Sequence, residues 1–266
     1  MTPAEHSASA TIVVPCYNEA RRLPVDAFSA FAPDHPRVQF LLVDDGSTDE
    51  TRSVIEALAQ KHPDSIATLV LPQNAGKAEA VRQGFLEAFK NKPPYVGFWD
   101  ADLATPLEDI PTFMALLDDR PDIEMIFGSR VNLLGRFIQR KATRHYLGRI
   151  FATAASTILG LAIYDTQCGA KMFRVSDDIE RAFQEPFISR WIFDVEIIAR
   201  IIQFRRGSDL PPVEQILYEY PLQVWRDVAG SKIRAGDFFT VGLDLLRIYR
   251  RYMSGRRRAA PSAGGN

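Results

Sequence analysis

The chain has 266 residues, a formal net charge of −1, 46% hydrophobic residues and 24% charged residues. This length suits one large domain or two small ones, and the composition is that of a soluble globular protein. The near-zero net charge excludes a global attraction to nucleic acid. Cys16 and Cys168 are the two cysteines, which excludes a disulfide framework and a cysteine metal site.

The two ends of the chain bear on its location. The segment MTPAEHSASA lacks the basic and apolar regions of a signal peptide. The longest apolar stretch, residues 150–164, is too short and too rich in small residues for a spanning helix. We therefore expect a cytoplasmic protein. Six arginines and no acid follow Leu245, which predicts peripheral contact with an anionic membrane surface; a solvated terminus explains them equally well.

In chain order, the first half alternates short buried strands with amphipathic helices. Strands are predicted at 11–15, 38–45, 66–72, 95–100 and 123–130, and helices at 47–62, 76–90 and 105–117. Ser47 and Glu50 have the spacing of a capping box, and Thr105 is the expected N-cap of the third helix. This alternation predicts a mostly parallel sheet with helices on both faces.

The second half is less regular. We expect a helix at 146–163, a turn leading into a strand at 165–174, a helix at 193–206, a strand at 213–225 and a helix at 237–253. Residues 1–10 are predicted to be flexible, and residues 254–266 to form a disordered basic tail. The chain shows no clear linker between these limits, which favours a single domain at 11–253.

Acidic residues follow two of the predicted strands. Asp44 and Asp45 end the second strand, and Asp100 and Asp102 follow the fourth. Residues i and i+2 of a strand point to the same side, so Asp100 and Asp102 should repel each other unless positive charge lies nearby. A Mg²⁺ or Mn²⁺ ion, with water and substrate phosphates as further ligands, would balance them. Because ligands bind beyond the carboxyl ends of parallel strands, this edge is the predicted site.

A glycine-lysine pair opens the second helix, in NAGKAEAVRQG (74–84). It is not an ATPase phosphate loop, because Leu71 and Ala78 stand where that motif requires Gly and Ser or Thr. A helix N-terminus carrying Lys77 is nevertheless a suitable anion site.

Taken together, the motifs resemble a known family. TIVVPCYNEARRL, LLVDDGSTDET, NAGKAEAVRQG and FWDADLATP resemble, in order and spacing, the family-2 glycosyltransferases with a GT-A fold. FGSR, DTQCGAKMFR, RWIFDVEII and VWRDVAGSKIR are similar to the polyprenyl-phosphate sugar synthases of that family, especially the dolichyl-phosphate β-glucosyltransferases. The matching segments run from about residue 11 to about 246. Ala78 departs from the glycine that often follows this lysine, and no spanning helix like that of some relatives is expected.

The resemblance implies a fold and a division of labour along the chain. The fold would be α/β, a GT-A-type Rossmann-like, mostly parallel sheet flanked by helices, with a C-terminal acceptor-side extension. Residues 11–130 would form the nucleotide-sugar half and residues 131–253 the acceptor half of the single domain.

The resemblance also implies roles for individual residues. Nucleotide-sugar binding would fall to Pro15, Tyr17, Glu19, Asp44, Asp45, Lys77, Asp100 and Ala101, and the metal to Asp100 and Asp102. The acceptor phosphate would be held by Arg130, Arg144, Ser231 and Lys232, and the sugar by Arg190, Trp191 and Asp194. Asp102 and Asp165 would be catalytic. Asp165 stands at the family's proposed base position, but an orienting role is equally compatible, because a lipid phosphate is already largely ionised.

The implied function is inverting transfer of glucose from UDP-glucose to a polyprenyl (dolichyl or undecaprenyl) phosphate, which gives a β-linked product. Alternatives are a GDP-mannose-dependent polyprenyl-phosphate mannosyltransferase and a family-2 enzyme with a soluble acceptor. A nucleotidyltransferase would need a glycine-rich basic loop after the first strand, where PCYNEARRL stands. A non-catalytic nucleotide-sugar module would not need all the motifs together.

Overall fold

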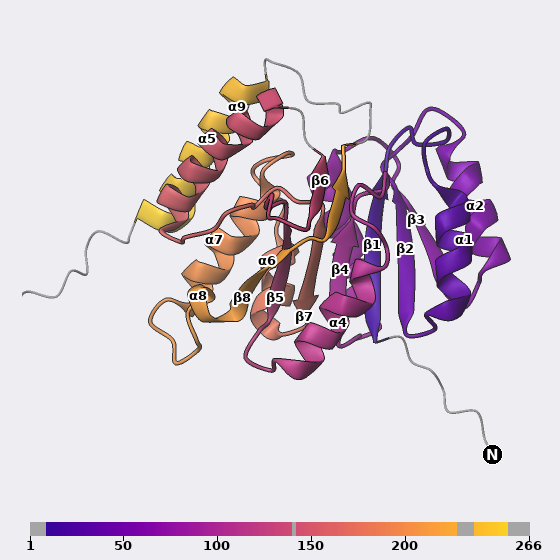
Figure 1. The fold of residues 1–266 in the computed structure, drawn as a ribbon, viewed down its shortest axis with the longest axis horizontal. Coiled ribbons are helices and arrows are strands. Elements are labelled where there is room, and N and C mark those ends of the chain that lie inside the picture. Colours follow the sequence, from indigo (N-terminus) through magenta and orange to yellow (C-terminus); the bar gives the residue numbers. More distant parts are fainter. Residues whose placement is uncertain (1–8, 140–141, 228–236, 255–266) are drawn as a thin grey trace, which may run out of the picture.

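The computed structural model describes residues 9–139, 142–227 and 237–254, and gives no side-chain environment for 142–147 or 237–239. A twisted seven-stranded sheet runs through the molecule in the order β3-β2-β1-β4-β7-β5-β8 (Figure 1). Its strands are β1 (Ala10–Cys16), β2 (Val38–Asp44), β3 (Ile66–Val70), β4 (Tyr95–Trp99), β5 (Met125–Ser129), β7 (Ala170–Arg174) and β8 (Leu217–Pro221). β7 pairs antiparallel with β4 and β5, and the other pairings are parallel.

Helices cover both faces of the sheet. In one core cluster, apolar residues of α1 (Val25–Asp34), α2 (Thr51–Lys61) and α4 (Asp109–Asp119) pack against residues of the sheet. The other cluster is built with α3 (Lys77–Phe89), α5 (Ala142–Leu159), α6 (Asp177–Gln184), α7 (Phe193–Arg205), α8 (Val213–Ile216) and α9 (Asp237–Ile248). Alternate residues of β1 point to opposite faces of the sheet, as the two-residue period of a strand requires. Val13 packs in the cluster with α3, and Ile12 and Val14 pack in the cluster with α1. The predicted α/β class with a mostly parallel sheet is confirmed.

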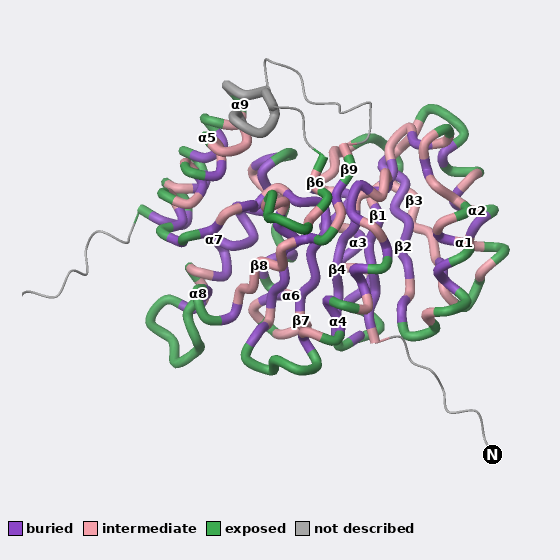
Figure 2. Tube along the Cα trace, in the orientation of Figure 1, coloured by how far each residue is buried: buried purple, intermediate pink, exposed green. Residues whose placement is uncertain are grey.

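Figure 2 shows the central strands buried along their length, with exposure concentrated in loops and on outer helix faces. The small pair β6 (Phe137–Gln139) and β9 (Val224–Arg226) lies outside the main sheet. A π-helical turn, Tyr249–Met253, extends α9 and contacts α7. No helix in the described part of the chain is long and apolar enough to cross a bilayer.

The capping box predicted at Ser47 and Glu50, for the helix expected at 47–62, is wrong. α2 begins at Thr51, with no side-chain cap at Glu50. Ser47 Oγ instead accepts the N–H of Asn18 at 3.0 Å, and Thr51 Oγ1 accepts the N–H of Glu19 at 2.7 Å. These side chains therefore join the loop after β1 to the loop after β2, a long-range use that local spacing does not reveal.

The predicted N-cap at Thr105 is also wrong. α4 begins at Asp109, after a turn at 106–108. Thr105 is 3% exposed, and its hydroxyl lies 3.8 Å from Cys168 Sγ instead of capping a helix. Burial against the sheet has overridden the local capping signal.

Other differences concern short elements. The sequence pattern does not predict α1, α6 or β6, and the strand expected at 213–225 is divided into α8, β8 and β9. α1 carries Pro33 in its last turn and is held by Phe28 and Phe31, whose rings pack edge-on against Phe40 of β2. Tertiary packing thus stabilises a helix with a weak local signal.

Gly84 of α3 allows a test of how closely the helix meets the sheet. A Cβ on Gly84 would lie 2.4 Å from Cγ1 of Val13, whereas a Cβ on Gly242, exposed in α9, would meet nothing within 4 Å. Helix propensity alone favours alanine at both positions by up to about 1 kcal/mol.

We expect Gly84→Ala to lower the free energy of unfolding by about 1–3 kcal/mol through overpacking. Gly242→Ala is the matched control and should be neutral or stabilising. Urea denaturation of both variants gives the comparison; equal gains in stability would contradict the close approach of α3 to β1.

Candidate functional site

The carboxyl ends of six parallel strands and the beginning of antiparallel β7 meet at one edge of the sheet. On the β1 and β2 side of this edge, hydrogen bonds join the loop after β1 to the loop after β2. Besides the Ser47 and Thr51 contacts, Asn18 Oδ1 accepts the N–H of Thr48 at 2.9 Å, and Asn18 has a φ of 52°. Pro15 and Tyr17 lie half-buried beside Glu19, whose carboxylate pairs with Arg22 at 2.6 Å.

The two aspartates after β2 differ in surroundings. Asp44 is 2% exposed and accepts the N–H of Ser47 at 3.1 Å. Asp45 accepts three hydrogen bonds, from Asn74 Nδ2 at 3.0 Å and from the N–H groups of Ala75 and Gly76 at 2.8 and 2.9 Å. Burial raises the pKa of Asp45 in spite of these donors. Asp45 therefore fixes the loop that leads into α3.

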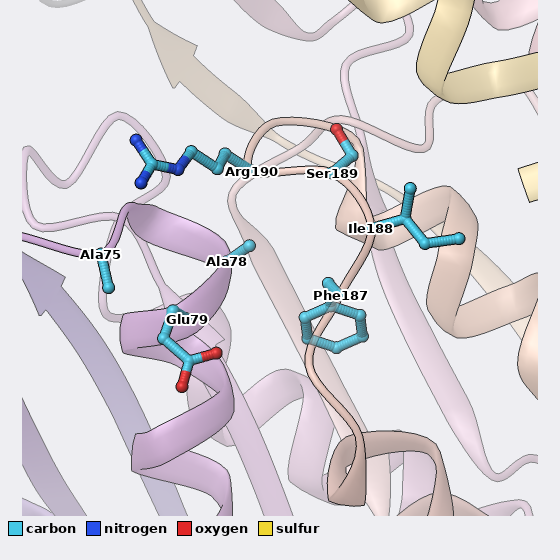
Figure 3. Close-up of a pocket in the computed structure, with 7 residues that line it drawn as sticks. All are labelled: Ala75, Ala78, Glu79, Phe187, Ile188, Ser189 and Arg190. Atoms are coloured by element: carbon cyan, nitrogen blue, oxygen red, sulfur yellow. The ribbon is translucent and has the colours of Figure 1, made fainter. Parts of the chain in front are cut away.

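Arg190 crosses over the start of α3. A Cβ on Gly76 would lie 3.3 Å from Cγ and Cδ of Arg190, and the guanidinium acts electrostatically on Asp45. Figure 3 shows Arg190 at the rim of a pocket between α3 and the loop before α7. The lining residues are Ala75, Ala78, Glu79, Phe187, Ile188, Ser189 and Arg190. Trp191 follows, 36% exposed.

Asp100 directly follows β4, and Gly169 and Lys77 contact it. Its N–H donates to the carbonyl of Gly169 at 2.9 Å, and its carboxylate fills the space above Gly169, where a Cβ would lie 1.9 Å from Oδ2. Oδ1 of Asp100 lies 2.5 Å from Nζ of Lys77. Burial lowers the pKa of Lys77, but Asp100, Asp194 and Asp102 outweigh it and raise the pKa, so the ammonium stays charged.

Asp102 lies two residues further along the same turn. Its Oδ1 accepts the N–H of Ala104 at 3.1 Å, and Leu103 between them has a φ of 50°. Burial raises the pKa of Asp102, and the charge of Asp100 raises it further. Ala101 is buried between the two aspartates. The like-charge problem expected from the sequence is therefore present here, and Lys77 balances part of it.

The pair fits a divalent cation that brings ligands with it. Within the described residues, no three or more His, Cys, Asp or Glu side chains surround one cation position. Mg²⁺ commonly binds through one or two carboxylates, completing its shell with water and substrate phosphates. Asp100 and Asp102 supply two such carboxylates at the sheet edge. Because Gly169 has no Cβ, the Asp100 carboxylate has room beside it.

Across the edge, Asp165 and Arg130 form a two-point ion pair. Arg130 Nε and Nη2 donate to Oδ2 and Oδ1 of Asp165 at 2.6 and 2.7 Å, and the Arg130 N–H adds a third bond at 3.1 Å. The N–H of Gln167 also donates to Oδ1 at 3.0 Å. Asp165 is 6% exposed. Its carboxylate thus has the surroundings of a group that orients an arginine.

Two residues that the sequence pattern does not single out, Glu219 and Trp225, support this pair. Glu219 of β8 accepts the N–H groups of Tyr164 and Asp165, both at 2.8 Å. The ring of Trp225 lies 5.3 Å from the Arg130 guanidinium, a cation–π distance. Glu219 stands in an alternating strand pattern that gives no hint of such a contact, so only the parallel pairing of β8 with β5 reveals it.

Asp194 was expected in the sugar pocket. It is 4% exposed, its Oδ1 lies 2.7 Å from Nζ of Lys171, and its Oδ2 accepts from Gln167 Nε2 at 3.2 Å. Burial raises the pKa of Asp194, and the two lysines Lys171 and Lys77 partly offset this effect. Its carboxylate faces these partners at the base of the site. Lys171 lies within the DTQCGAKMFR motif, but nothing in that motif predicts its burial.

The structure therefore brings most of the predicted site residues to one edge of the sheet. They are Pro15, Tyr17, Glu19, Asp44, Asp45, Lys77, Asp100, Ala101, Asp102, Arg130, Asp165, Arg190, Trp191 and Asp194. Ser231 and Lys232 lie outside the described residues. Arg144 falls in α5, but its side chain is not described. Arginines 256–258 also lie outside the described part.

Comparison with known proteins gives consistent findings. Residues 11–181 match the family model described as Glycosyl transferase family 2. Human dolichyl-phosphate beta-glucosyltransferase is 32% identical over 260 residues, covering 92% of this chain and 76% of that protein. The Dictyostelium discoideum protein of the same name is 30% identical over 259 residues, covering 92% and 75%.

A solved structure shares the fold. Glucosyl-3-phosphoglycerate synthase from Mycobacterium tuberculosis, in complex with Mn²⁺, UDP and glucosyl-3-phosphoglycerate, superposes with a TM-score of 0.63 at 18% identity. The match covers 97% of this chain and 82% of that one.

Gly169→Ala tests how the Asp100 carboxylate is placed. The new methyl group would lie 1.9 Å from Oδ2, so the carboxylate has to move. We expect affinity for Mn²⁺, read from the electron paramagnetic resonance signal of free Mn²⁺, to fall about 10- to 100-fold, as for other changes behind a metal ligand. Gly242→Ala should leave it unchanged; an unaffected Gly169→Ala would show that Asp100 does not hold the ion.

Proposed function

The chain belongs to glycosyl transferase family 2, and on that premise we propose that it transfers glucose from UDP-glucose to a polyprenyl phosphate. The observation that carries the proposal is the match over 92% of the chain to proteins named dolichyl-phosphate beta-glucosyltransferase. The site geometry supports the proposal: the Lys77–Asp100 pair and the Arg130–Asp165 pair lie at one edge of the sheet, where a cation-bound diphosphate and a second phosphate would need them.

The nucleotide would bind at the β1 and β2 side. Tyr17 and the buried Asp44 flank the cross-linked loops there, and a buried carboxylate is a strong acceptor for ribose hydroxyls or a base N–H. Lys77 lies at the diphosphate end, against Asp100, and so is better placed for phosphate oxygens than for the base.

Asp100 and Asp102 would hold a Mg²⁺ or Mn²⁺ ion at the diphosphate. Such an ion supplies stabilisation for the negative charge that builds on the departing nucleotide. Lys77 adds a fixed positive charge beside it, and its raised pKa, which its acidic neighbours impose against the effect of burial, keeps that charge in place at neutral pH.

At the acceptor side, Arg130 would bind the lipid phosphate. The second pKa of a phosphate monoester is about 6, so the acceptor is largely ionised and needs positive charge more than a base. Asp165 uses both oxygens on Arg130 and Gln167, which supports an orienting role for it. The ring of Trp225, at a cation–π distance of 5.3 Å, would help to hold the guanidinium in this position.

In the transfer step, a phosphate oxygen of the acceptor attacks the anomeric carbon from the face opposite the nucleotide. The new carbon–oxygen bond forms as the bond to UDP breaks, and the electron pair leaves on the β-phosphate oxygen. The configuration inverts, so an α-linked donor gives a β-linked glucosyl lipid.

The test is transfer of labelled sugar from UDP-glucose and from GDP-mannose, in parallel, to polyprenyl phosphate in detergent with Mn²⁺. We expect label in the lipid phase from UDP-glucose alone, and we expect Asp102→Asn to abolish it because one cation ligand is lost. Asp122→Asn, an exposed change after α4, is the matched control and should retain activity.

Each other outcome has a definite meaning. Label from GDP-mannose alone would replace the donor and keep the acceptor. No lipid product from either donor, with the nucleotide still bound, would overturn the lipid acceptor.

We further propose peripheral binding to the membrane that holds this lipid. Large apolar side chains are exposed just after Arg130: Leu133, Leu134 and Phe137 have exposed fractions of 47%, 104% and 49%. On the outer helices, Ile150 of α5 is 69% exposed, and Leu243 and Leu246 of α9 are each 41% exposed. Apolar side chains next to basic ones are typical of an interfacial surface.

We expect Leu133→Ser/Leu134→Ser to weaken co-sedimentation with anionic liposomes several-fold, because less apolar area enters the lipid. Leu210→Ser is the matched control, since Leu210 is 50% exposed but lies at the opposite edge, before α8. Equal binding of both variants and the wild type would contradict membrane contact through this loop.

A further inference from the structure

A buried ion pair beneath the acidic edge has no part in the steps above. Lys171 of β7 is 1% exposed and Asp194 of α7 is 4% exposed, with Nζ and Oδ1 2.7 Å apart. The ammonium also lies 5.0 and 4.8 Å from the ring centroids of Phe98 and Phe127. Desolvating two charges is costly, and apolar residues of similar volume often serve stability as well or better. A pair retained at this position therefore calls for a role besides stability.

Both members of the pair hold the same turn, residues 165–169. Lys171 donates a hydrogen bond to the carbonyl of Cys168. Asp194 accepts one from Nε2 of Gln167 at 3.2 Å. Two consecutive residues of the turn are thus fixed from below by one ion pair, and the pair itself is anchored in β7 and α7.

That turn connects the two halves of the site. At its beginning, Asp165 grips Arg130 through two hydrogen bonds. At its end, the carbonyl of Gly169 accepts a hydrogen bond from the N–H of Asp100. Because Gly169 has no Cβ, the Asp100 carboxylate can occupy the space beside it. A shift of the turn would therefore move the acceptor-side arginine and the cation ligand together.

We propose that Lys171 and Asp194 are a positioning pair. The pair clamps the 165–169 turn and so fixes the positions of Asp100 and Arg130 relative to each other. The inference rests on the proposed function, in which these two groups serve the nucleotide diphosphate and the acceptor phosphate. Neither member of the pair touches substrate in this account. The competing explanation is a pair that stabilises the fold only.

The experiment replaces the pair by apolar residues of similar size, Lys171→Met/Asp194→Leu, in the full chain. Removing both charges together avoids the unpaired buried charge that either single change would leave. Three quantities are measured: the melting temperature, the Kd of UDP in EDTA and in Mn²⁺, and kcat for glucosyl transfer.

If the pair clamps the turn, the double variant should change some of these quantities and leave others unchanged. Tyr17 follows β1 and Asp44 ends β2, away from the turn, so the Kd of UDP in EDTA should stay near the wild-type value. The gain in UDP affinity on adding Mn²⁺, and kcat, should each fall about 10- to 100-fold, as for other groups that orient a metal ligand. The melting temperature should change little. A folded double variant with unchanged Mn²⁺ enhancement and kcat overturns the proposal.

Two further variants keep the test decisive. Gln167→Ala removes one contact of the clamp and leaves the ion pair intact, so it should lower the Mn²⁺ enhancement even if the double variant does not fold; no effect would contradict the clamp. Arg205→Met breaks a buried ion-pair cluster with Glu124 and Asp178 at the opposite edge. It should lower the melting temperature without changing the Mn²⁺ enhancement.

Different measurements would reject this inference and the proposed function. Absence of glucosyl lipid with the wild-type chain would reject the lipid acceptor. UDP binding and its Mn²⁺ dependence involve no acceptor, so they still decide whether the pair clamps the turn.

Discussion

The structure depends on the balance of charge at one edge of its sheet. Like charges held close in a partly dry site repel strongly, so each carboxylate there needs a compensating group. Four of them pair with a basic side chain: Glu19 with Arg22, Asp100 with Lys77, Asp165 with Arg130 and Asp194 with Lys171. Asp102 accepts a backbone N–H instead, and burial together with the charge of Asp100 raises its pKa. The edge is thus arranged to receive one more positive charge, beside Asp102.

The antiparallel strand β7 makes this arrangement possible. It enters the sheet between β4 and β5, so that the turn before it arrives at the edge where the parallel strands end. A parallel strand in that place would begin at the opposite edge. By this reversal Asp165 and Gly169 reach Arg130 and Asp100, and one short turn serves both phosphates of the proposed reaction.

Local signals in the sequence were enough for the alternating strands and helices of the first half other than α1, and for the acids at strand ends. Asp100 and Asp102 follow a buried strand, and that position alone located the edge. The capping signals failed at Ser47 and Thr105 because both side chains are used in long-range contacts. Lys171 and Glu219 could not be assigned, because their partners depend on strand order, which periodicity does not encode. The individual site roles taken from the family resemblance remain predictions.

The central claim is that Asp100 and Asp102 hold the cation of the nucleotide diphosphate. The most direct measurement is anomalous diffraction at the manganese edge from crystals grown with UDP and Mn²⁺. We expect one strong peak in contact with an oxygen of both aspartates, with the Lys77 ammonium moved from Asp100 toward a phosphate oxygen. A peak away from both aspartates, with the Lys77–Asp100 pair intact, would contradict it.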